Sequence, residues 1–198
     1  MKFDLELKKQ IRENIKVKKS LVLMSKSLIN ATNSIYQTLK NNGKVFLCGN
    51  GGSAADAQHL AAEFLIRLRP NVNRKALPFL TLATDTSTIT ACGNDYSFND
   101  IFSRPFEALA NKNDLLFAIS TSGNSKNIVN VLKKSKQKKI KSISLLGNNG
   151  GKAKTYSDVP IIVKSKNVAR IQEAHIFLGH FMLQMVEDKI LKDEKAKF

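Results

Sequence analysis

Residues 44–69 read KVFLCGNGGSAADAQHLAAEFLIRLR, and this stretch decides the fold that the rest of the chain follows. A short apolar run at 45–47 leads into a glycine-rich turn at 49–53, and an alanine-rich helical segment comes next. A strand, a glycine turn and a helix in this order point backbone N–H groups and a helix N-terminus at an anion, usually a phosphate. The stretch therefore predicts an α/β fold with an anion-binding turn.

The helix of this unit also carries two side chains suited to chemistry. His59 and Glu63 are four residues apart, so they lie on one helical face, one turn from each other. An imidazole and a carboxylate near an anion-binding turn suggest chemistry on a phosphorylated small molecule.

Strands and helices alternate along the rest of the chain. Further strands are predicted at 79–82, 115–119, 141–146 and 159–163. Helices are predicted at 54–68, from 85 to 92, at 126–137 and at 168–192, and another helix with Pro105 just inside its start runs to residue 110. A turn is predicted at 93–96. Apolar strands separated by helices argue for a parallel sheet that is covered on both faces. We expect a three-layer α/β/α sandwich with five parallel strands, whose C-terminal ends share one edge and bind the ligand.

A long helical lead precedes the first strand. Residues 4–28 and 30–41 are predicted to be helical, and Asn41-Asn42-Gly43 ends the second helix. The apolar positions of this lead must be buried on the core or on another subunit. No linker divides the chain, so we expect one domain over residues 1–198, with residues 1–42 as an oligomerising helical extension.

Composition narrows the class of protein. A chain of 198 residues suffices for one well-buried domain. Its N-terminal sequence carries acids and has no apolar run, and no stretch is long enough to span a bilayer, so we expect neither a signal peptide nor a membrane segment. Cys48 and Cys92 are then expected to be reduced thiols of a cytoplasmic protein.

The formal net charge of +16 invites a nucleic-acid interpretation, because lysines cluster at residues 133–139. The alternative is a solvated, lysine-rich surface that attracts anionic substrates in general. No nucleic-acid motif accompanies the charge, and the chain has no tryptophan to stack on bases. We favour the general attraction and expect no nucleic-acid partner.

A second turn, Ser120-Thr121-Ser122-Gly123-Asn124-Ser125, follows the third predicted strand. Hydroxyls and backbone N–H groups at a strand-to-helix junction suit a sugar-phosphate monoester, although an ordinary helix cap would look the same. The first turn fits the dinucleotide pattern G-x-G-x-x-A, but Asp85 comes roughly ten residues too late for the expected acid, and no G-K-[ST] follows to make a P-loop. The second turn is therefore the better phosphate site, and residues 49–53 are left to hold the sugar.

The final predicted helix adds Gln172 and His180, which are eight residues apart and share one side of the helix. With His59 and Glu63 they offer two imidazoles, a carboxylate and an amide oxygen, a set that suits zinc or a similar divalent ion. Spacing alone leaves open whether the two helices meet. His175 lies about 140° from His180 around the helix and is expected to be a structural histidine.

Four segments resemble the SIS-domain phosphoheptose isomerases: CGNGGSAADAQHLAAE at 48–63, GNDYSFNDIFSRP at 93–105, AISTSGNS at 118–125 and ARIQEAHIFLGH at 169–180. The resemblance covers nearly the whole chain in the same order. It implies an isomerase that converts sedoheptulose 7-phosphate to D-glycero-D-manno-heptose 7-phosphate, the first step toward activated heptose for surface polysaccharide such as lipopolysaccharide. It also implies a homotetramer with active sites between subunits.

The resemblance assigns roles to individual residues. Implied ligands of one zinc ion per subunit are His59, Glu63, Gln172 and His180. Implied substrate contacts are Asn50, Gly51, Gly52, Ser53, Glu63, Asn94, Asp95, Ser120, Thr121, Ser122, Ser125 and Gln172. Glu63 as base and His180 as acid would move a proton between C1 and C2 through an enediol(ate). Ile66 and Ala169 depart from the family pattern, where a glycine and an aspartate often stand, and both positions bear on pocket shape.

The nearest alternative is a non-catalytic SIS-domain regulator that binds the replication initiator protein. That protein resembles this chain in its CGNG, AQH and ARIQE segments but lacks the acid after AQHxAA and the second histidine of the last helix. Both Glu63 and His180 are present here, so the resemblance favours the enzyme. A sugar-phosphate-sensing domain would likewise keep the serine turn without the acid/base pair.

Overall fold

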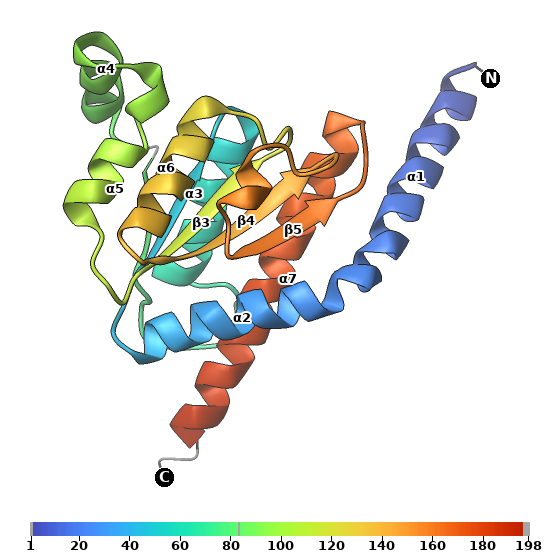
Figure 1. Cartoon of the computed structure of the whole chain (residues 1–198). Coiled ribbons are helices and arrows are strands. Elements are labelled where there is room, and N and C mark those ends of the chain that lie inside the picture. The colour runs from blue at the N-terminus through green and yellow to red at the C-terminus, as the bar shows by residue number, and fades with distance from the viewer. Residues whose placement is uncertain (1, 83, 196–198) are drawn as a thin grey trace.

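The computed structural model describes residues 2–82 and 84–195, and its centre is one parallel sheet (Figure 1). The five strands are β1 (Val45–Gly49), β2 (Phe79–Thr81), β3 (Leu115–Ser120), β4 (Lys141–Gly147) and β5 (Val159–Val163). They lie in the order β2-β1-β3-β4-β5, with Val45 of β1 opposite both Phe79 and Leu115. The predicted five-stranded parallel sheet is confirmed.

Helices connect the strands and cover both faces of the sheet. The α-helices are α1 (Lys2–Ser20), α2 (Ser25–Lys40), α3 (Gly52–Leu65), α4 (Thr86–Asp95), α5 (Ser103–Leu109), α6 (Lys126–Gln137) and α7 (Val168–Lys195). The 3₁₀ turns are η1 (Leu21–Met24), η2 (Phe98–Asp100) and η3 (Ala153–Thr155). Across residues 2–82 and 84–195, none of these helices combines the length and the apolarity that a membrane span requires.

Alternate residues of the strands point to opposite faces and build two separate cores. On one face, Leu47 and Phe117 pack with apolar side chains of α2, α3 and α7. On the other face, Phe46 and Leu116 pack with α5 and α6. This arrangement is the expected three-layer α/β/α sandwich (Figure 1).

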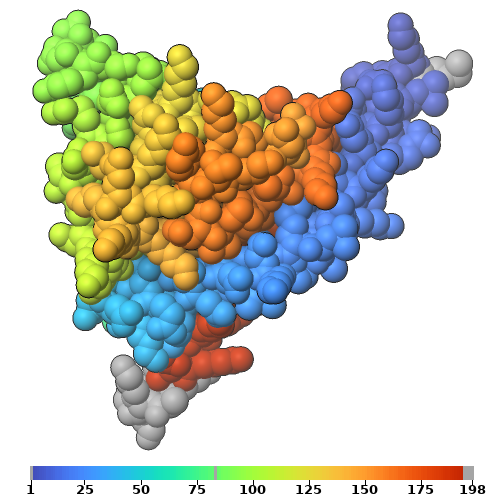
Figure 2. Space-filling view, viewed as in Figure 1, coloured from blue at the N-terminus to red at the C-terminus, as the bar shows by residue number. Residues whose placement is uncertain are grey.

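The helical lead is confirmed as α1, η1 and α2. Helix α2 packs along α7, whereas α1 extends beyond the body of the molecule, as the blue surface in Figure 2 shows. Val17 is the buried apolar residue of α1, and Phe3, Leu5 and Ile11 of that helix are exposed. The lead therefore leaves apolar side chains uncovered in the single chain.

Three predicted boundaries are wrong. The helical lead divides at η1, Leu21–Met24, rather than at residue 29, so residues 25–28 belong to α2. Helix α3 ends at Leu65 rather than at 68, because the returning chain takes over its last carbonyls, as when Leu77 N–H donates to Phe64 O at 3.0 Å. The predicted turn at 93–96 is largely helix, since α4 continues to Asp95 and Tyr96 N–H donates to Cys92 O at 3.1 Å.

The two cysteines are free and buried, as expected for reduced thiols. Burial alone raises the pKa of the Cys48 thiol far above its ordinary range, so this group is an inert part of the core.

Candidate active site

The candidate site lies at the topological switch point of the sheet, where the direction in which successive strands are added reverses. The strand order places this switch point between β1 and β3, and parallel α/β sheets bind ligands at the C-terminal ends of such strands. The two predicted turns follow these two strands. Asn50 and Asn127 join the turns through a reciprocal pair of amide hydrogen bonds, each 2.9 Å long. Sequence reasoning missed Asn127, and only its place in the first turn of α6 could have suggested it.

The serine turn is shaped by its own hydrogen bonds. Ser120 Oγ accepts from Gly123 N–H at 3.1 Å, and Ser122 Oγ accepts from Asn124 N–H at 3.1 Å. Ser125 is the N-cap of α6, yet its hydroxyl makes no capping hydrogen bond and lies 3.4 Å from Ser120 Oγ. Thr121, Ser122 and Ser125 all retain exposed surface. The turn thus gathers hydroxyls at a helix N-terminus, where an anion is favoured.

Helices α3 and α7 approach each other closely about two helical turns beyond the glycine turn. A Cβ atom on Gly179 of α7 would lie only 2.6 Å from Leu60 Cδ1 of α3, so glycine at this position lets the two helices touch. The next residue on α7 is His180, and the residue before Leu60 is His59. This contact therefore answers the question that the spacing left open, because the two helices do meet.

Three predicted site residues converge at this contact. His59 Nε2 lies 2.8 Å from His180 Nε2 and 3.2 Å from Glu63 Oε1, and His180 Nε2 lies 3.9 Å from the same carboxylate oxygen. The Glu63 side chain is 17% exposed, so the carboxylate is sheltered but reachable. The two imidazole rings meet edge to face, with their centroids 5.0 Å apart.

The donor set and its spacing fit a metal ion. Zinc bound tetrahedrally through bonds of about 2.0–2.2 Å holds neighbouring ligand atoms about 3.4 Å apart. The three separations of 2.8, 3.2 and 3.9 Å in the structure surround that value. His59, Glu63 and His180 can therefore hold a divalent ion with small side-chain rotations.

Gln172 lies beside the glycine turn. A Cβ atom on Gly52 would lie 2.5 Å from Gln172 Nε2, so the amide rests directly against the backbone at the start of α3. This contact brings the fourth predicted ligand to the first turn, along with Gly51, the N-cap of α3, and the buried Ser53. Its role as a metal ligand stays a prediction.

Asp56 is a buried carboxylate near His59 and His180 that the sequence analysis did not single out. It lies three residues before His59, and its Oδ2 atom is buried without a hydrogen-bond partner. Burial raises the pKa of Asp56, and the nearby His59 and His180 imidazoles act in the opposite direction. The i to i+3 spacing with His59 was a usable signal, because such residues share a helical face.

Asn94 and Asp95 lie apart from this cluster in the single chain. They occupy the last turn of α4, where Asn94 Nδ2 donates to Asp95 Oδ1 at 2.8 Å and both residues are exposed. Helix α4 packs against η2 and stands at one corner of the molecule (Figure 1). Their predicted part in substrate binding stays a prediction.

His175 belongs to the core, as expected for a structural histidine. It is fully buried on α7, and neither ring nitrogen has a well-formed hydrogen bond. Burial lowers its pKa from 6.5 to about 4, and a nearby backbone group of Leu146 opposes this shift only in part. The ring is therefore neutral at physiological pH.

Comparison with known proteins gives a consistent result. Residues 8–147 match the family model described as the SIS domain. The phosphoheptose isomerase of Helicobacter pylori strain P12 is 45% identical over 184 residues, which are 93% of this chain and 95% of that protein. The phosphoheptose isomerase of Campylobacter concisus is 50% identical over 162 residues, 82% of this chain and 85% of that protein.

Solved structures agree with these relatives. Phosphoheptose isomerase GmhA from Neisseria gonorrhoeae superposes with a TM-score of 0.87 at 37% identity, covering 94% of this chain and 99% of that one. A phosphoheptose isomerase from Francisella tularensis gives a TM-score of 0.89 at 32% identity, covering 95% and 99%. The chain is thus a member of the SIS-domain family and belongs, within it, to the phosphoheptose isomerases.

Proposed function

We propose that this sugar-phosphate isomerase converts sedoheptulose 7-phosphate to D-glycero-D-manno-heptose 7-phosphate, and that it does so in the cytoplasm, as the first step toward activated heptose for surface polysaccharide. The observation that carries the proposal is the convergence of His59 and Glu63, on the helix that follows the first turn, with His180 of α7. The substrate is the one implied by the names of the relatives at 45–50% identity.

The substrate phosphate would bind at the serine turn. Support comes from the hydroxyls of Ser120, Thr121, Ser122 and Ser125, which gather at the N-terminus of α6. The Ser125 hydroxyl makes no capping hydrogen bond to the helix, which leaves it available to a ligand. The sugar would then extend along the first turn, past Asn50, Gly51, Gly52 and Ser53, toward Glu63 and Gln172. Asn94 and Asp95 would complete the substrate contacts.

Glu63 and His180 would carry the proton transfer. Glu63 takes a proton from C1 of the ketose while His180 gives one to the C2 oxygen, which forms the enediol. His180 then recovers a proton from the C1 hydroxyl, and Glu63 returns its proton to C2, which yields the aldose with no net gain or loss of hydrogen. The 3.9 Å between Glu63 Oε1 and His180 Nε2 supports this assignment, because both groups border the same small space.

We further propose that His59, Glu63, Gln172 and His180 hold one zinc ion per subunit. A bound divalent ion supplies positive charge that polarises substrate oxygens and stabilises a developing oxyanion. The protein's own contribution is to present two imidazoles and a carboxylate at suitable spacing.

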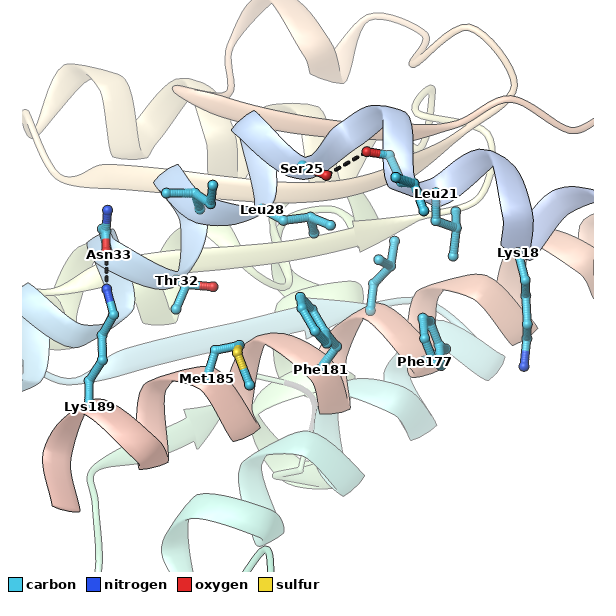
Figure 3. Close-up of a pocket in the computed structure, with 13 residues that line it drawn as sticks. Lys18, Leu21, Ser25, Leu28, Thr32, Asn33, Phe177, Phe181, Met185 and Lys189 are labelled. Atoms are coloured by element: carbon cyan, nitrogen blue, oxygen red, sulfur yellow. Dashed lines mark hydrogen bonds between the residues drawn. The ribbon is translucent and has the colours of Figure 1, made fainter. Parts of the chain in front are cut away.

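The single domain would assemble as a homotetramer with active sites between subunits. Support comes from an apolar groove of about 490 Å³ between the helical lead and α7. Figure 3 shows Phe177 and Phe181 of α7 pointing toward Leu21 and Leu28 of the lead across this groove. The exposed Val22 and Ile29 line it as well, and a second copy of the chain would cover them.

The lysine-rich surface would serve to attract the anionic substrate, and we propose no nucleic-acid partner.

The test is direct. Purified protein is incubated with sedoheptulose 7-phosphate, and aldose formation is followed by NMR together with the Glu63→Gln and His180→Gln variants. We expect product from the wild type and little from either variant. No product from the wild type, or wild-type rates in both variants, would contradict the assignment. Metal analysis of protein purified without chelator tests zinc separately, and the zinc proposal fails if no metal binds and added zinc has no effect.

A further inference from the structure

A buried arginine outside the candidate site links the two helices that build it. Arg74 lies in the loop between α3 and β2, and its side chain is only 1% exposed. Its guanidinium donates from Nη2 to Glu63 O at 2.8 Å and from Nη1 to Phe64 O at 3.1 Å, while Nε donates to Glu187 Oε1 at 2.7 Å. One side chain thus bonds the end of α3 and the middle of α7 at the same time.

The contacts on α3 meet a need that every helix end has. The last carbonyls of an α-helix have no partner within the helix and carry its negative dipole end, so a cation is favoured there. Arg74 supplies donors to the carbonyl of Glu63 itself and to the one that follows. Its guanidinium also lies over the Phe64 ring, 5.0 Å from the centroid. The backbone of Glu63 is therefore held directly by Arg74.

The contact on α7 lies on the side of the helix that carries His180. Glu187 follows His180 by seven residues, which is about 20° short of two full turns. Its carboxylate is 0% exposed, and the oxygen that does not face Arg74 accepts from Arg69 Nε at 2.5 Å. Arg69 in turn forms an ion pair with Asp188 at 2.7 Å. Glu187 is thus a fixed point on α7 from which Arg74 reaches α3.

We infer that Arg74 is a positioning residue, which sets the separation of α3 and α7 and thereby the placement of Glu63 relative to His180. It acts through backbone and Glu187 contacts and does not touch the reacting atoms. The inference rests on the proposed function for its chemical consequence, since it concerns the spacing of the proposed acid, base and metal ligands.

Only an arginine fits this role. Its planar guanidinium presents several donors in fixed directions, whereas a lysine offers one compact charge on a flexible stem. Arg74→Lys keeps a cation opposite Glu187 but cannot reproduce the donors to both carbonyls. Replacing a whole buried ion pair by apolar residues of similar size is often neutral or stabilising. Arg74→Met with Glu187→Met therefore removes the link while leaving the Arg69–Asp188 pair in place.

The experiment compares Arg74→Lys and the Arg74→Met/Glu187→Met double variant with the wild type, and Arg69→Met is the matched control. Arg69 bonds the same carboxylate, but its contacts to Glu187 and Asp188 both lie on α7. Zinc affinity is measured by calorimetry. The kinetic constants kcat and KM are measured with sedoheptulose 7-phosphate as substrate, and folding is followed by thermal unfolding. Crystal structures of the metal-free variants then report the separation of Glu63 Oε1 and His180 Nε2.

We expect both Arg74 variants to bind zinc about 10–100-fold more weakly, as is typical when a residue that orients metal ligands is removed, with the loss of kcat exceeding any change in KM. Arg69→Met should stay within about threefold of the wild type. Wild-type zinc affinity in a folded Arg74 variant overturns the inference. Should the double variant fail to fold, Arg74→Lys decides alone. If the wild type binds no zinc, the proposed metal site fails, but the role of Arg74 can still be tested. A separation of 3.9 Å between Glu63 Oε1 and His180 Nε2 that persists in the metal-free variants would overturn that role.

Discussion

His59 Nε2 and His180 Nε2 lie 2.8 Å apart although 121 residues separate them in the chain. They meet because α3 and α7 touch at Leu60 and Gly179, the residues next to the two histidines. At Gly179 a methyl group would overlap the buried Leu60 side chain, with 2.6 Å between the added Cβ and Leu60 Cδ1. Glycine at this position therefore brings the two imidazoles within reach of one ligand.

Replacing Gly179 with alanine should separate the helices and weaken the site. Overpacking costs about 1–3 kcal/mol, which the better helix propensity of alanine, about 1 kcal/mol, partly offsets. We therefore expect the melting temperature to fall by only a few degrees. Zinc affinity and kcat/KM, measured by calorimetry and NMR assay, should fall about tenfold, the size of effect seen when metal ligands are reoriented.

The matched control is Gly93→Ala in α4. An added Cβ on Gly93 meets no atom within 4 Å, so the same substitution creates no overlap there. It should stabilise the protein by about 0.5–1 kcal/mol and leave zinc affinity unchanged. Unchanged zinc affinity in Gly179→Ala would show that the close approach at Leu60 is not what places His180.

Most of the fold was predictable because it depends on local patterns. Apolar runs bounded by turns located all five strands, and alternation with helices is sufficient to indicate a parallel sheet. The end of α3 was misplaced because it depends on Leu77 N–H and the Arg74 guanidinium, donors that come back from a later part of the chain. The extent of α4 was misjudged because Gly93 normally signals a turn but lies here inside a helix.

The site was predictable residue by residue but not as an arrangement. His59 and Glu63 share a helical face by spacing alone, and Asp56 could have been added by the same rule. The meeting of α3 with α7 depends on Gly179 and Leu60, which are distant in sequence and unremarkable singly. The Asn50–Asn127 pair and the Arg74–Glu187 link are likewise long-range contacts, and no local pattern shows which residues pair.

Ser125→Ala should weaken substrate binding without weakening the fold. The Ser125 hydroxyl makes no capping hydrogen bond, and its one contact with Ser120 Oγ is long at 3.4 Å, so its loss should change the melting temperature little. A hydrogen bond to a charged group contributes about 1.5–3 kcal/mol, which corresponds to a rise in KM of about tenfold or more, with kcat nearly constant. The control variant is Thr155→Ala, at an exposed residue whose hydroxyl donates to Lys152 O at 2.9 Å, and it should keep the wild-type KM. A wild-type KM in Ser125→Ala would remove this serine from the phosphate site.

Val22→Glu should break the proposed tetramer. Val22 lines the apolar groove and is 72% exposed in the single chain, so a charge there costs the monomer little but would be buried in an interface. Sedimentation velocity should show a smaller species, with unchanged circular dichroism. Leu109→Glu on α5, where the leucine is 57% exposed and outside the groove, is the control and should stay tetrameric. A tetrameric Val22→Glu variant would exclude this groove from the interface, and a monomeric wild type would contradict the assembly itself.

The buried His175 should make the protein sensitive to acid. Its pKa falls from an ordinary value of 6.5 to about 4 in the folded state, so between these values the unfolded chain binds more protons than the folded one. Stability is therefore highest above about pH 6.5 and declines as the pH falls toward 4, by up to about 3 kcal/mol from this residue. His175→Leu removes the titrating ring and keeps an apolar side chain in the core. Urea unfolding between pH 4.5 and 7.5 should show a clearly flatter pH dependence for the variant than for the wild type. Parallel curves for the two proteins would mean that His175 does not control the acid sensitivity, and the exposed carboxylates would then be the groups to examine.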